Sequence, residues 1–221
     1  MSYKSKINNS IEIIRKASSL GKGVVAFSGG KDGLAAAILI NKIIPNIEMV
    51  CETSFYFPKQ LEDIKKTAKM LGFNVTYVCN LSDEWLMKHK TKLLFSSSAK
   101  VRQWSFNVRQ QNTIKKFATQ VGADVTYTGR RTQENSVPKE IYSTKKNGMQ
   151  AHPLRSWTTN DIWEFISDQG LERPFIYSTR WGEQGNSPFY SYNPRKRNKS
   201  IQECWDLVNE IDGGEFYKKF G

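Results

Sequence analysis

The chain has 221 residues, of which 38% are hydrophobic and 24% charged, a balance that excludes a disordered chain and suits one domain or one domain with a short appendage. No apolar run approaches the roughly 18 residues of a membrane helix, and residues 1–20 are polar and charged, so neither a membrane span nor a secretory signal is expected. The formal net charge of +12 favours polyanionic partners, nucleotides or nucleic acid, although solubility alone accounts for it equally well.

Helices and strands are predicted to alternate over residues 1–170. Short continuous apolar runs indicate strands buried on both faces, and apolar residues at helical spacing indicate helices. In chain order the predicted elements are a helix at 7–20, a strand at 24–27, a helix at 33–44, a strand at 47–51, a helix at 58–71, a strand at 74–79, helices at 82–90 and 104–121, a strand at 124–128 and a helix at 158–167. Asn9 or Ser10 is expected to cap the first helix.

The alternation of strands and helices implies right-handed crossovers and a mostly parallel sheet, so the predicted fold class is an α/β sandwich. Residues 91–103 are expected to form an irregular basic loop. After Gly170 the composition becomes rich in aromatic residues, proline, glycine and basic residues. We therefore predict an α/β domain at 1–170, followed at 171–221 by an aromatic and basic lid segment that ends in a helix at 201–211.

The three cysteines, Cys51, Cys79 and Cys204, are widely spaced and include no CxxC pair, and the two histidines, His89 and His152, are isolated. This spacing is not that of a zinc or iron–sulfur site, so no metal ligand is predicted among them. A disulfide framework is expected even less. A reducing cytoplasm is the expected compartment.

The segment SGGKDG, residues 28–33, stands at the expected turn from the first strand into the second helix. Glycines let backbone amides approach an anion, the helix N-terminus adds partial positive charge, and Lys31 adds a full charge. Ser28 offers a hydroxyl donor. The pattern predicts a cradle for phosphate or sulfate, with a plain flexible turn as the alternative. Asp32 after the lysine excludes a Walker A loop, which needs serine or threonine there.

SGGKDG resembles the SGGKDS loop of the PP-loop, or N-type ATP pyrophosphatase, superfamily, with Gly33 in place of the usual serine. The segment CETSFYFPKQ, residues 51–60, is similar to the DTG-x-x-FPET segment of the phosphoadenosine phosphosulfate (PAPS) reductase family, with Glu52 in place of the usual aspartate. The residues that match in this segment are Thr53, Phe57 and Pro58.

Two later segments extend the resemblance. TGRRTQENS, residues 128–136, is similar to the family's GxRxxES loop, and HPLRSWTTNDIWEFI, residues 152–166, is similar to its PL-x-x-W-x-x-x-DIW-x-YI segment. The matching residues are Gly129, Arg130, Arg131, the shifted Glu134 and Ser136, and then Pro153, Leu154, Trp157, Asp161, Ile162 and Trp163. The four motifs follow the family's order, so the chain is identified by resemblance as PAPS reductase-like.

The resemblance implies the adenine nucleotide alpha-hydrolase-like fold, a three-layer sandwich with a mostly parallel five-stranded sheet. It implies a site for ATP or a related adenine nucleotide, with Mg²⁺ as companion ion. Catalytic roles are predicted for Lys31, Arg130 and Arg131, whose charges would hold phosphate or sulfate. The predicted nucleotide ligands are Ser28, Gly29, Gly30, Asp32, Gly33, Glu52, Thr53 and Phe57. A solvated basic loop is the alternative for the arginines, and a helix-capping turn is the alternative for 52–54.

Departures from the family pattern bear on the activity. The family's reductases carry a catalytic cysteine in E-C-G-x-H, but here Trp205 follows Glu203 and Cys204, and the paired cysteines of the iron–sulfur branch are replaced by SSSAKVRQW. The leading expectation is an ATP-dependent enzyme of nucleotidyl or sulfur-related transfer that acts at the α-phosphate and releases pyrophosphate. A thiol-dependent PAPS reductase and a non-catalytic nucleotide- or nucleic-acid-binding module are the alternatives. Nucleic acid or a partner subunit stays open as a further partner.

Overall fold

The computed structural model describes residues 1–54, 56–79, 88, 98–133, 137, 139–144, 148–178, 201–215 and 218. The chain forms two compact units, each made of several stretches of sequence. The first comprises Met1–Glu52, Lys66–Val78 and Ile114–Arg173, and the second comprises Thr53–Lys65, Cys79–Thr113 and Pro174–Gly221. The division at residue 170 stays a prediction.

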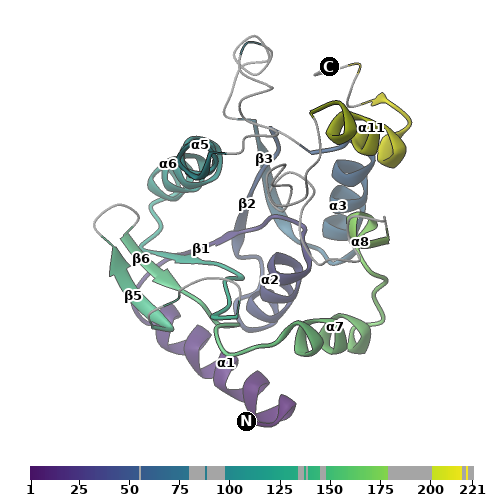
Figure 1. Cartoon of the computed structure of the whole chain (residues 1–221). Helices are drawn as coiled ribbons and strands as arrows, with labels where there is room; N and C mark the ends of the chain where they lie inside the picture. Colours follow the sequence, from purple (N-terminus) through teal and green to yellow (C-terminus); the bar gives the residue numbers. More distant parts are fainter. Residues whose placement is uncertain are drawn as a thin grey trace. The chain divides into compact units, whose positions relative to one another are not determined.

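The first unit is built on a sheet whose described strands number six, in the spatial order β3-β2-β1-β4-β6-β5 (Figure 1). The strands are β1 (Gly23–Ala26), β2 (Glu48–Glu52), β3 (Asn74–Val78), β4 (Val125–Tyr127), β5 (Ile141–Thr144) and β6 (Gly148–Ala151). Neighbouring strands are parallel except that β5 runs antiparallel to β6. The predicted α/β class with a mostly parallel sheet is confirmed, but the predicted count of five strands is wrong.

The hairpin of β5 and β6 was not predicted from the sequence. Its second strand reads GMQA, which lacks the β-branched and aromatic residues that mark a strand. One signal was present: the dipeptide Asn147-Gly148 is typical of a tight hairpin turn. Gly148 indeed adopts a φ of 64°, in the left-handed region that glycine tolerates.

Helix α6 (Asn112–Gln120) covers one face of the sheet. Its residues Phe117 and Ala118 pack against Val24 of β1 and Val50 of β2, and all four side chains are buried. Burial of such an apolar cluster is the main force that holds a helix on a sheet. The helix predicted at 104–121 therefore has its apolar side where an α/β sandwich requires it.

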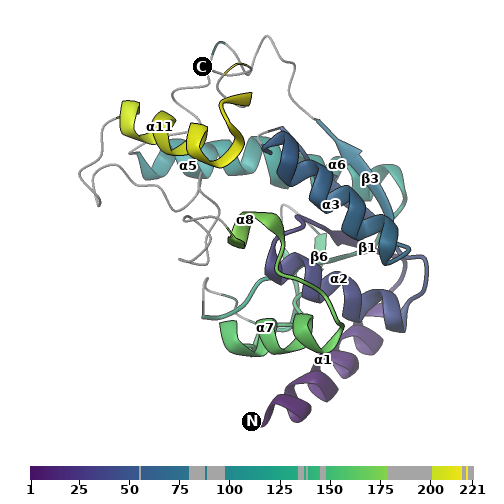
Figure 2. The ribbon, with the colours of Figure 1, turned by 90° about the vertical axis from the view of Figure 1, so that its right-hand side faces the viewer.

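Three helices of the first unit lie together on the other face in both views (Figures 1 and 2): α1 (Tyr3–Ser18), α2 (Lys31–Ile43) and α7 (Thr159–Asp168). The Tyr127 hydroxyl of β4 reaches this layer and donates a hydrogen bond to the Ile14 carbonyl of α1, with 3.4 Å between the oxygens. Helices on both faces explain why β1 is a continuous apolar run.

Helix α1 begins earlier than predicted because Ser2 caps it, its hydroxyl oxygen accepting a backbone N–H of the first turn. Neither Asn9 nor Ser10 is the cap. Ser10 is fully buried, and its hydroxyl donates to the Pro153 carbonyl (2.7 Å) and accepts the indole N–H of Trp157 (2.9 Å). Ser10, which the sequence pattern offered as a helix cap, therefore connects α1 to Pro153 and Trp157 in the interior.

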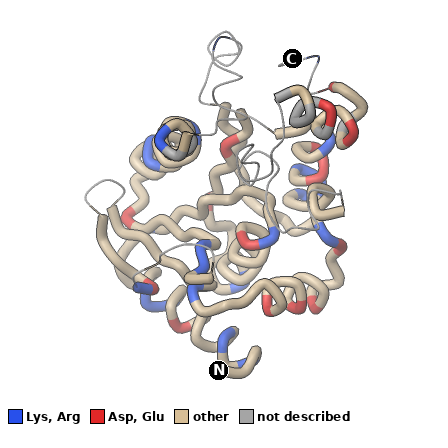
Figure 3. The backbone as a smooth tube through the Cα atoms, in the orientation of Figure 1, with Lys and Arg blue, Asp and Glu red and all other residues tan. Residues whose placement is uncertain are grey.

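Acidic residues mark helix α7 (Figure 3). Thr158 and Asp161 form a capping box at its start, and the predicted helix at 158–167 is confirmed. Asp161 also accepts a hydrogen bond from Lys6 Nζ of α1 at 2.5 Å, and Asp168 accepts one from the Tyr3 hydroxyl at 3.0 Å. Burial opposes ionisation of Asp161, but the hydrogen bonds from Lys6 and Thr158 outweigh it and lower its pKa. These contacts tie α1 to α7.

The second unit is mainly helical in its described residues. Helix α3 (Pro58–Met70) begins in it, and the other helices are α5 (Ala99–Phe106), the π-helical turn η1 (Asn107–Gln111), α8 (Phe175–Ser178) and α11 (Ile201–Asp212). The predicted helix at 201–211 is confirmed. The predicted loop at 91–103 is wrong over its last residues, because Ser98 caps α5 by accepting the Val101 N–H.

Several sequence-based expectations fall outside the described residues. They are the helix at 82–90 apart from Lys88, the loop residues 91–97, and the aromatic and basic residues of 179–200. Among the described helices, none is both long enough and apolar enough to cross a membrane.

Candidate functional site

The SGGKDG segment forms a tight turn at the carboxyl end of β1. The strand is still held at Phe27, whose N–H donates to the Val50 carbonyl at 2.9 Å. Gly29 then adopts a φ of 64°, a conformation that strains other residues. Gly30 occupies the cap position of α2 and has no side chain to cover the first amides of the helix. Such amides, aligned with the helix dipole, form an anion-binding terminus.

The departure at Gly33 has a local steric reason. A Cβ added there would lie 2.7 Å from the Ser28 hydroxyl oxygen and 3.2 Å from the Ser28 backbone nitrogen. Glycine at this position therefore leaves the Ser28 hydroxyl room against the start of α2. The same hydroxyl accepts the Gly30 N–H at 3.4 Å, which helps to fix the turn.

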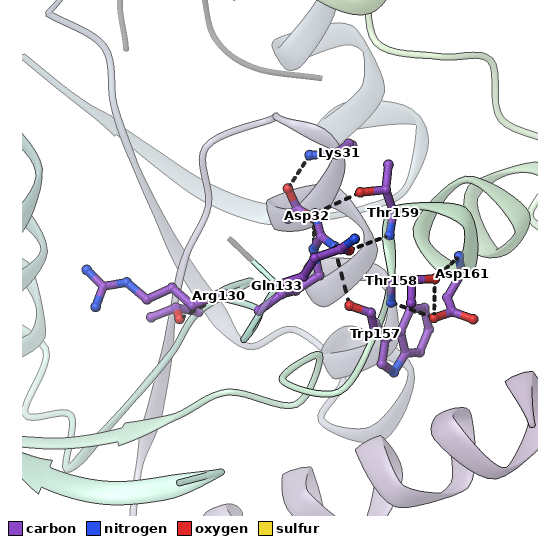
Figure 4. A network of polar contacts seen from close by, with 10 residues as sticks. Lys31, Asp32, Arg130, Gln133, Trp157, Thr158, Thr159 and Asp161 are labelled. Atoms are coloured by element: carbon purple, nitrogen blue, oxygen red, sulfur yellow. Dashed lines mark hydrogen bonds and ion pairs between the residues drawn. The ribbon is translucent and has the colours of Figure 1, made fainter. Parts of the chain in front are cut away.

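An ion-paired network of three side chains begins in this turn (Figure 4). The Asp32 carboxylate receives Lys31 Nζ on one oxygen at 2.7 Å and Arg131 Nε on the other at 2.6 Å. The side chains of Lys31 and Arg131 are only 2% and 0% exposed, and that of Asp32 is 19% exposed. A carboxylate between two buried cations provides the compensation that buried charges need.

The rest of the Arg131 guanidinium contacts helix α7 and the residues beside it. Its terminal nitrogens donate to Gln133 Oε1 at 2.9 Å, to the Trp157 carbonyl at 3.3 Å and to Thr159 Oγ1 at 3.4 Å. Gln133 Oε1 also accepts the Thr159 N–H at 3.1 Å. Arg131 therefore joins the start of α2 to the start of α7.

Arg130, the neighbouring arginine, has a different setting. Its side chain is half-buried and points away from the Lys31–Asp32 pair, whereas its backbone N–H donates to Thr128 Oγ1 at 3.3 Å (Figure 4). The two arginines of the motif therefore diverge. The structure brings Arg131 together with Lys31 and Asp32, but directs Arg130 elsewhere.

Gly129, between Thr128 and Arg130, lies against the backbone of the SGGKDG turn, residues 28–33. A Cβ added at Gly129 would be 2.5 Å from the Asp32 carbonyl oxygen and 2.9 Å from the Gly33 nitrogen. A residue with a Cβ fits here only if one of these two backbone segments moves. The motif at 128–136 thus touches the SGGKDG motif through main chain as well as through the ion pairs.

His152 was not predicted as a site residue, yet it is fully buried beneath the Thr128–Arg130 turn. Its Nδ1 lies 2.7 Å from Thr128 Oγ1. Burial, reinforced by the positive charges of Arg130 and Arg155, lowers the pKa of His152 from 6.5 to about 4. The ring is therefore neutral at physiological pH. Its only sequence signal was its place at the start of the fourth family segment, residues 152–166.

The stability of the fold should depend on pH through His152. In the unfolded chain this histidine keeps its ordinary pKa of 6.5, so between 6.5 and about 4 the unfolded chain binds more protons and stability falls as pH drops. We expect the histidine to remove about 2 kcal/mol of unfolding free energy between about pH 7 and about pH 5. Urea denaturation of the native chain and of His152→Asn at both pH values measures this loss. An identical pH dependence in the two proteins would contradict the assignment.

The remaining predicted ligands follow strand β2. Glu52 is the buried last residue of β2 in the first unit. Thr53 and Phe57 belong to the second unit, where Phe57 is fully buried and the Thr53 carbonyl accepts the Tyr56 N–H at 3.4 Å. Their roles as nucleotide ligands stay predictions. Glu134 and Ser136 of the motif at 128–136, and the side chain of Cys204, lie outside what the structure describes.

Comparison with known proteins identifies a domain family and several similar proteins. Residues 22–188 match the family model of the phosphoadenosine phosphosulfate reductase domain. The chain is 26% identical over 201 residues to a sulfate adenylyltransferase subunit 2 of Shewanella sediminis, covering 76% of this chain and 64% of the relative. It is 24% identical over 189 residues to an uncharacterized protein of Methanocaldococcus jannaschii, covering 76% of this chain and 45% of that protein.

A solved structure shares the fold. The crystal structure of the phosphoadenylyl-sulfate (PAPS) reductase of Candida auris, a phosphate complex, matches with a TM-score of 0.58 at 15% identity, covering 77% of this chain and 84% of that chain. The α/β architecture with its mostly parallel sheet is therefore that of the PAPS reductase fold. The chain spans 64% and 45% of the lengths of the two curated relatives above.

Proposed function

Since the chain belongs to the phosphoadenosine phosphosulfate reductase domain family, we propose that it is a nucleotide-binding enzyme that transfers the adenylyl group of ATP and releases pyrophosphate. The observation that carries the proposal is the network of Lys31, Asp32 and Arg131 at the carboxyl end of β1. Ligands of open α/β sheets collect at such strand ends. The buried cations and the uncovered amides of α2 suit a polyphosphate.

Sulfate is the acceptor that we favour, because two relatives are named as sulfate adenylyltransferase subunit 2. In this reaction a sulfate oxygen attacks the α-phosphorus of ATP and forms a bond to it. The bond from the α-phosphorus to the oxygen that bridges to the β-phosphate breaks, and pyrophosphate leaves with that electron pair. The products are adenylyl sulfate and pyrophosphate, and no proton needs to be transferred.

The described residues divide this work between holding and positioning. The amides of residues 28–33 and the ammonium group of Lys31 would hold the phosphates that become pyrophosphate. Arg131 and Asp32 would position that loop, since their mutual contacts are internal. Arg130 would stabilise negative charge that develops during transfer. This division refines the sequence-based expectation that both arginines clamp the anion.

Mg²⁺ enters the proposal through the nucleotide. When bound to ATP it neutralises phosphate charge. Both carboxylate oxygens of Asp32 are engaged by cations, and no group of three or more His, Cys, Asp or Glu side chains gathers among the described residues. The protein side therefore does not fit a dedicated metal cage, and the ion would be held mainly by the phosphates.

Calorimetric titration with ATP and Mg²⁺ is the primary test, because binding depends on the chain's own loop. Release of pyrophosphate on addition of sulfate is the second test. We include a partner subunit in the proposal, since the relatives are named as subunits. No heat of ATP binding at about millimolar concentration, far above typical nucleotide affinities, would overturn the proposal. Binding without pyrophosphate release in the presence of every acceptor and partner tested would favour the non-catalytic alternative.

Replacement of Lys31 by methionine should weaken ATP binding by about tenfold, because one charge-assisted hydrogen bond to phosphate is lost. Asp32 keeps its pair with Arg131, so the fold should survive. Lys22→Met is the matched control. Lys22 directly precedes β1, at the end of the strand away from the SGGKDG turn, and it pairs with Glu48 on the surface. Equal ATP affinity of Lys31→Met and Lys22→Met in titration would contradict the role of Lys31.

A thiol-dependent PAPS reductase is the second candidate, favoured by the name of the matching family. The match ends at residue 188, before Cys204, and Cys204 falls within the helical span of α11. We therefore expect Cys204→Ser to retain ATP binding and pyrophosphate release unchanged, and the native chain to release no sulfite from PAPS with dithiothreitol. Sulfite release that disappears in Cys204→Ser would instead establish the reductase.

A further inference from the structure

We propose that His152 is a positioning residue that fixes the turn Thr128–Arg130 and thereby sets Arg130 for the anionic substrate. The inference rests on the proposed function, because it assigns Arg130 to a bound polyphosphate or its transition state. It adds a residue that stands first in the quoted segment 152–166 but is not among the residues that match the family there.

The Thr128 hydroxyl links the ring of His152 to the backbone of this turn. Thr128 Oγ1 lies 2.7 Å from His152 Nδ1 and accepts the Arg130 backbone N–H at 3.3 Å. A hydroxyl can take part in both contacts at once, since it has one proton and two lone pairs. The ring of His152 therefore orients the hydroxyl that holds the backbone of Arg130.

His152 is itself held from two sides of the sheet. Its backbone N–H donates to the Glu140 carbonyl at 2.7 Å, and the Thr128 N–H donates to the Ala151 carbonyl at 3.0 Å. The Tyr142 ring of β5 lies against the imidazole, with 5.2 Å between ring centroids. The ring is fully buried, so it cannot swing out to solvent while β6 stays paired with β4 and β5. This rigidity is what a positioning residue requires.

The buried ring carries one further clue. Its Nε2 is buried and has no hydrogen-bond partner among the described residues. A purely structural histidine would normally satisfy both ring nitrogens, since an unmade buried hydrogen bond costs free energy. Among the described residues only Nδ1 has a partner, so the Thr128 contact is the described hydrogen bond that the ring makes.

The charges that face the imidazole connect it to the substrate. Arg130 and Arg155 both disfavour its protonation, and Arg155 is in turn paired with the Glu140 side chain at 3.3 Å. Among the described residues, Tyr142 is a further titratable neighbour of the imidazole. An anion bound at Arg130 would offset one of the two positive charges. The imidazole should then become easier to protonate when ATP is bound.

The test combines ATP affinity with the titration of His152. We expect His152→Leu and Thr128→Val each to weaken ATP binding by about tenfold, as the loss of one buried hydrogen bond predicts. His152→Asn should restore affinity close to that of the native chain, because its amide can still pair with the threonine hydroxyl. Thr126→Val, two residues earlier in β4, is the matched control and should bind ATP normally.

The titration is followed by NMR of the two histidines, with His89→Gln used to assign the signals. The pKa of His152 should rise on addition of ATP and also in Arg130→Met without ATP. Loss of affinity in His152→Leu with recovery in His152→Asn, together with these shifts, supports the proposal. Native affinity in His152→Leu and Thr128→Val, or an unchanged His152 pKa in Arg130→Met, overturns it even where the native chain binds ATP. If the native chain itself binds no ATP, the proposed function fails and this inference falls with it.

Discussion

Replacing Arg131 by methionine is expected to lower the free energy of unfolding by about 3 kcal/mol, the lower end of the range for breaking a buried ion pair. The guanidinium is fully buried, and its loss leaves one oxygen of Asp32 without its cation. It also leaves the Trp157 carbonyl and Gln133 Oε1 without a strong donor. Methionine retains most of the side-chain volume, so the measured loss would report the polar contacts and not a cavity.

Urea denaturation followed by tryptophan fluorescence measures this change. Arg155→Met is the matched control, because Arg155 also pairs with a carboxylate but its side chain is 29% exposed, and partly exposed pairs contribute about 1 kcal/mol or less. The double variant Asp32→Asn with Arg131→Met should recover part of the loss, since it removes the uncompensated charge. A cost for Arg131→Met no greater than that for Arg155→Met would show that the network does not hold the two motifs together.

Replacing Gly129 by alanine should damage the site more than any single charge removal. The new Cβ would lie 2.5 Å from the Asp32 carbonyl oxygen and 2.6 Å from the Asp32 carbonyl carbon, and both belong to main chain that cannot rotate away. The loop 28–33 or the turn at Thr128–Arg130 must shift, at a cost of about 2 kcal/mol for overpacking. Because the shift displaces several amides of the proposed phosphate site at once, ATP affinity should fall further than in Lys31→Met.

Gly122→Ala separates this steric effect from the general cost of losing a glycine. Gly122 adopts a φ of 65° and has open space around its Cβ position, so alanine there should cost about 1 kcal/mol for the left-handed conformation alone. It should leave ATP affinity unchanged. Calorimetry on both variants decides the matter: native ATP affinity in Gly129→Ala would mean that the two loops move independently.

The parts of the fold that the sequence predicted correctly are those with strong local patterns. The run that became β1 is continuously apolar because helices cover both faces, β2 is apolar at its centre, and Thr158 marks a helix start by its chemistry. The hairpin of β5 and β6 carries weak strand propensity, and its position in the sheet depends on pairing with β4. Such non-local pairing leaves no local signature.

The candidate site shows the same division. From the motifs we expected Lys31 and the two arginines to hold one anion together. The spacing of residues in a sequence does not, however, reveal the direction in which a side chain points. Arg131 turns inward because Asp32 and the segment Trp157–Thr159, which are far apart in sequence, converge on it. His152 escaped prediction for a related reason: an isolated histidine belongs to no motif until the fold places Thr128 beside it.

The linkage between α1 and α7 bears on how small a working fragment of this protein can be. The family match starts at residue 22, after α1 has ended. Trimming the chain to that boundary would remove Ser10, which accepts the Trp157 indole N–H, and Lys6, which pairs with Asp161. The carbonyl of the same Trp157 accepts a hydrogen bond from Arg131. A fragment designed to keep the candidate site intact therefore has to retain the leading helix together with its Ser2 cap.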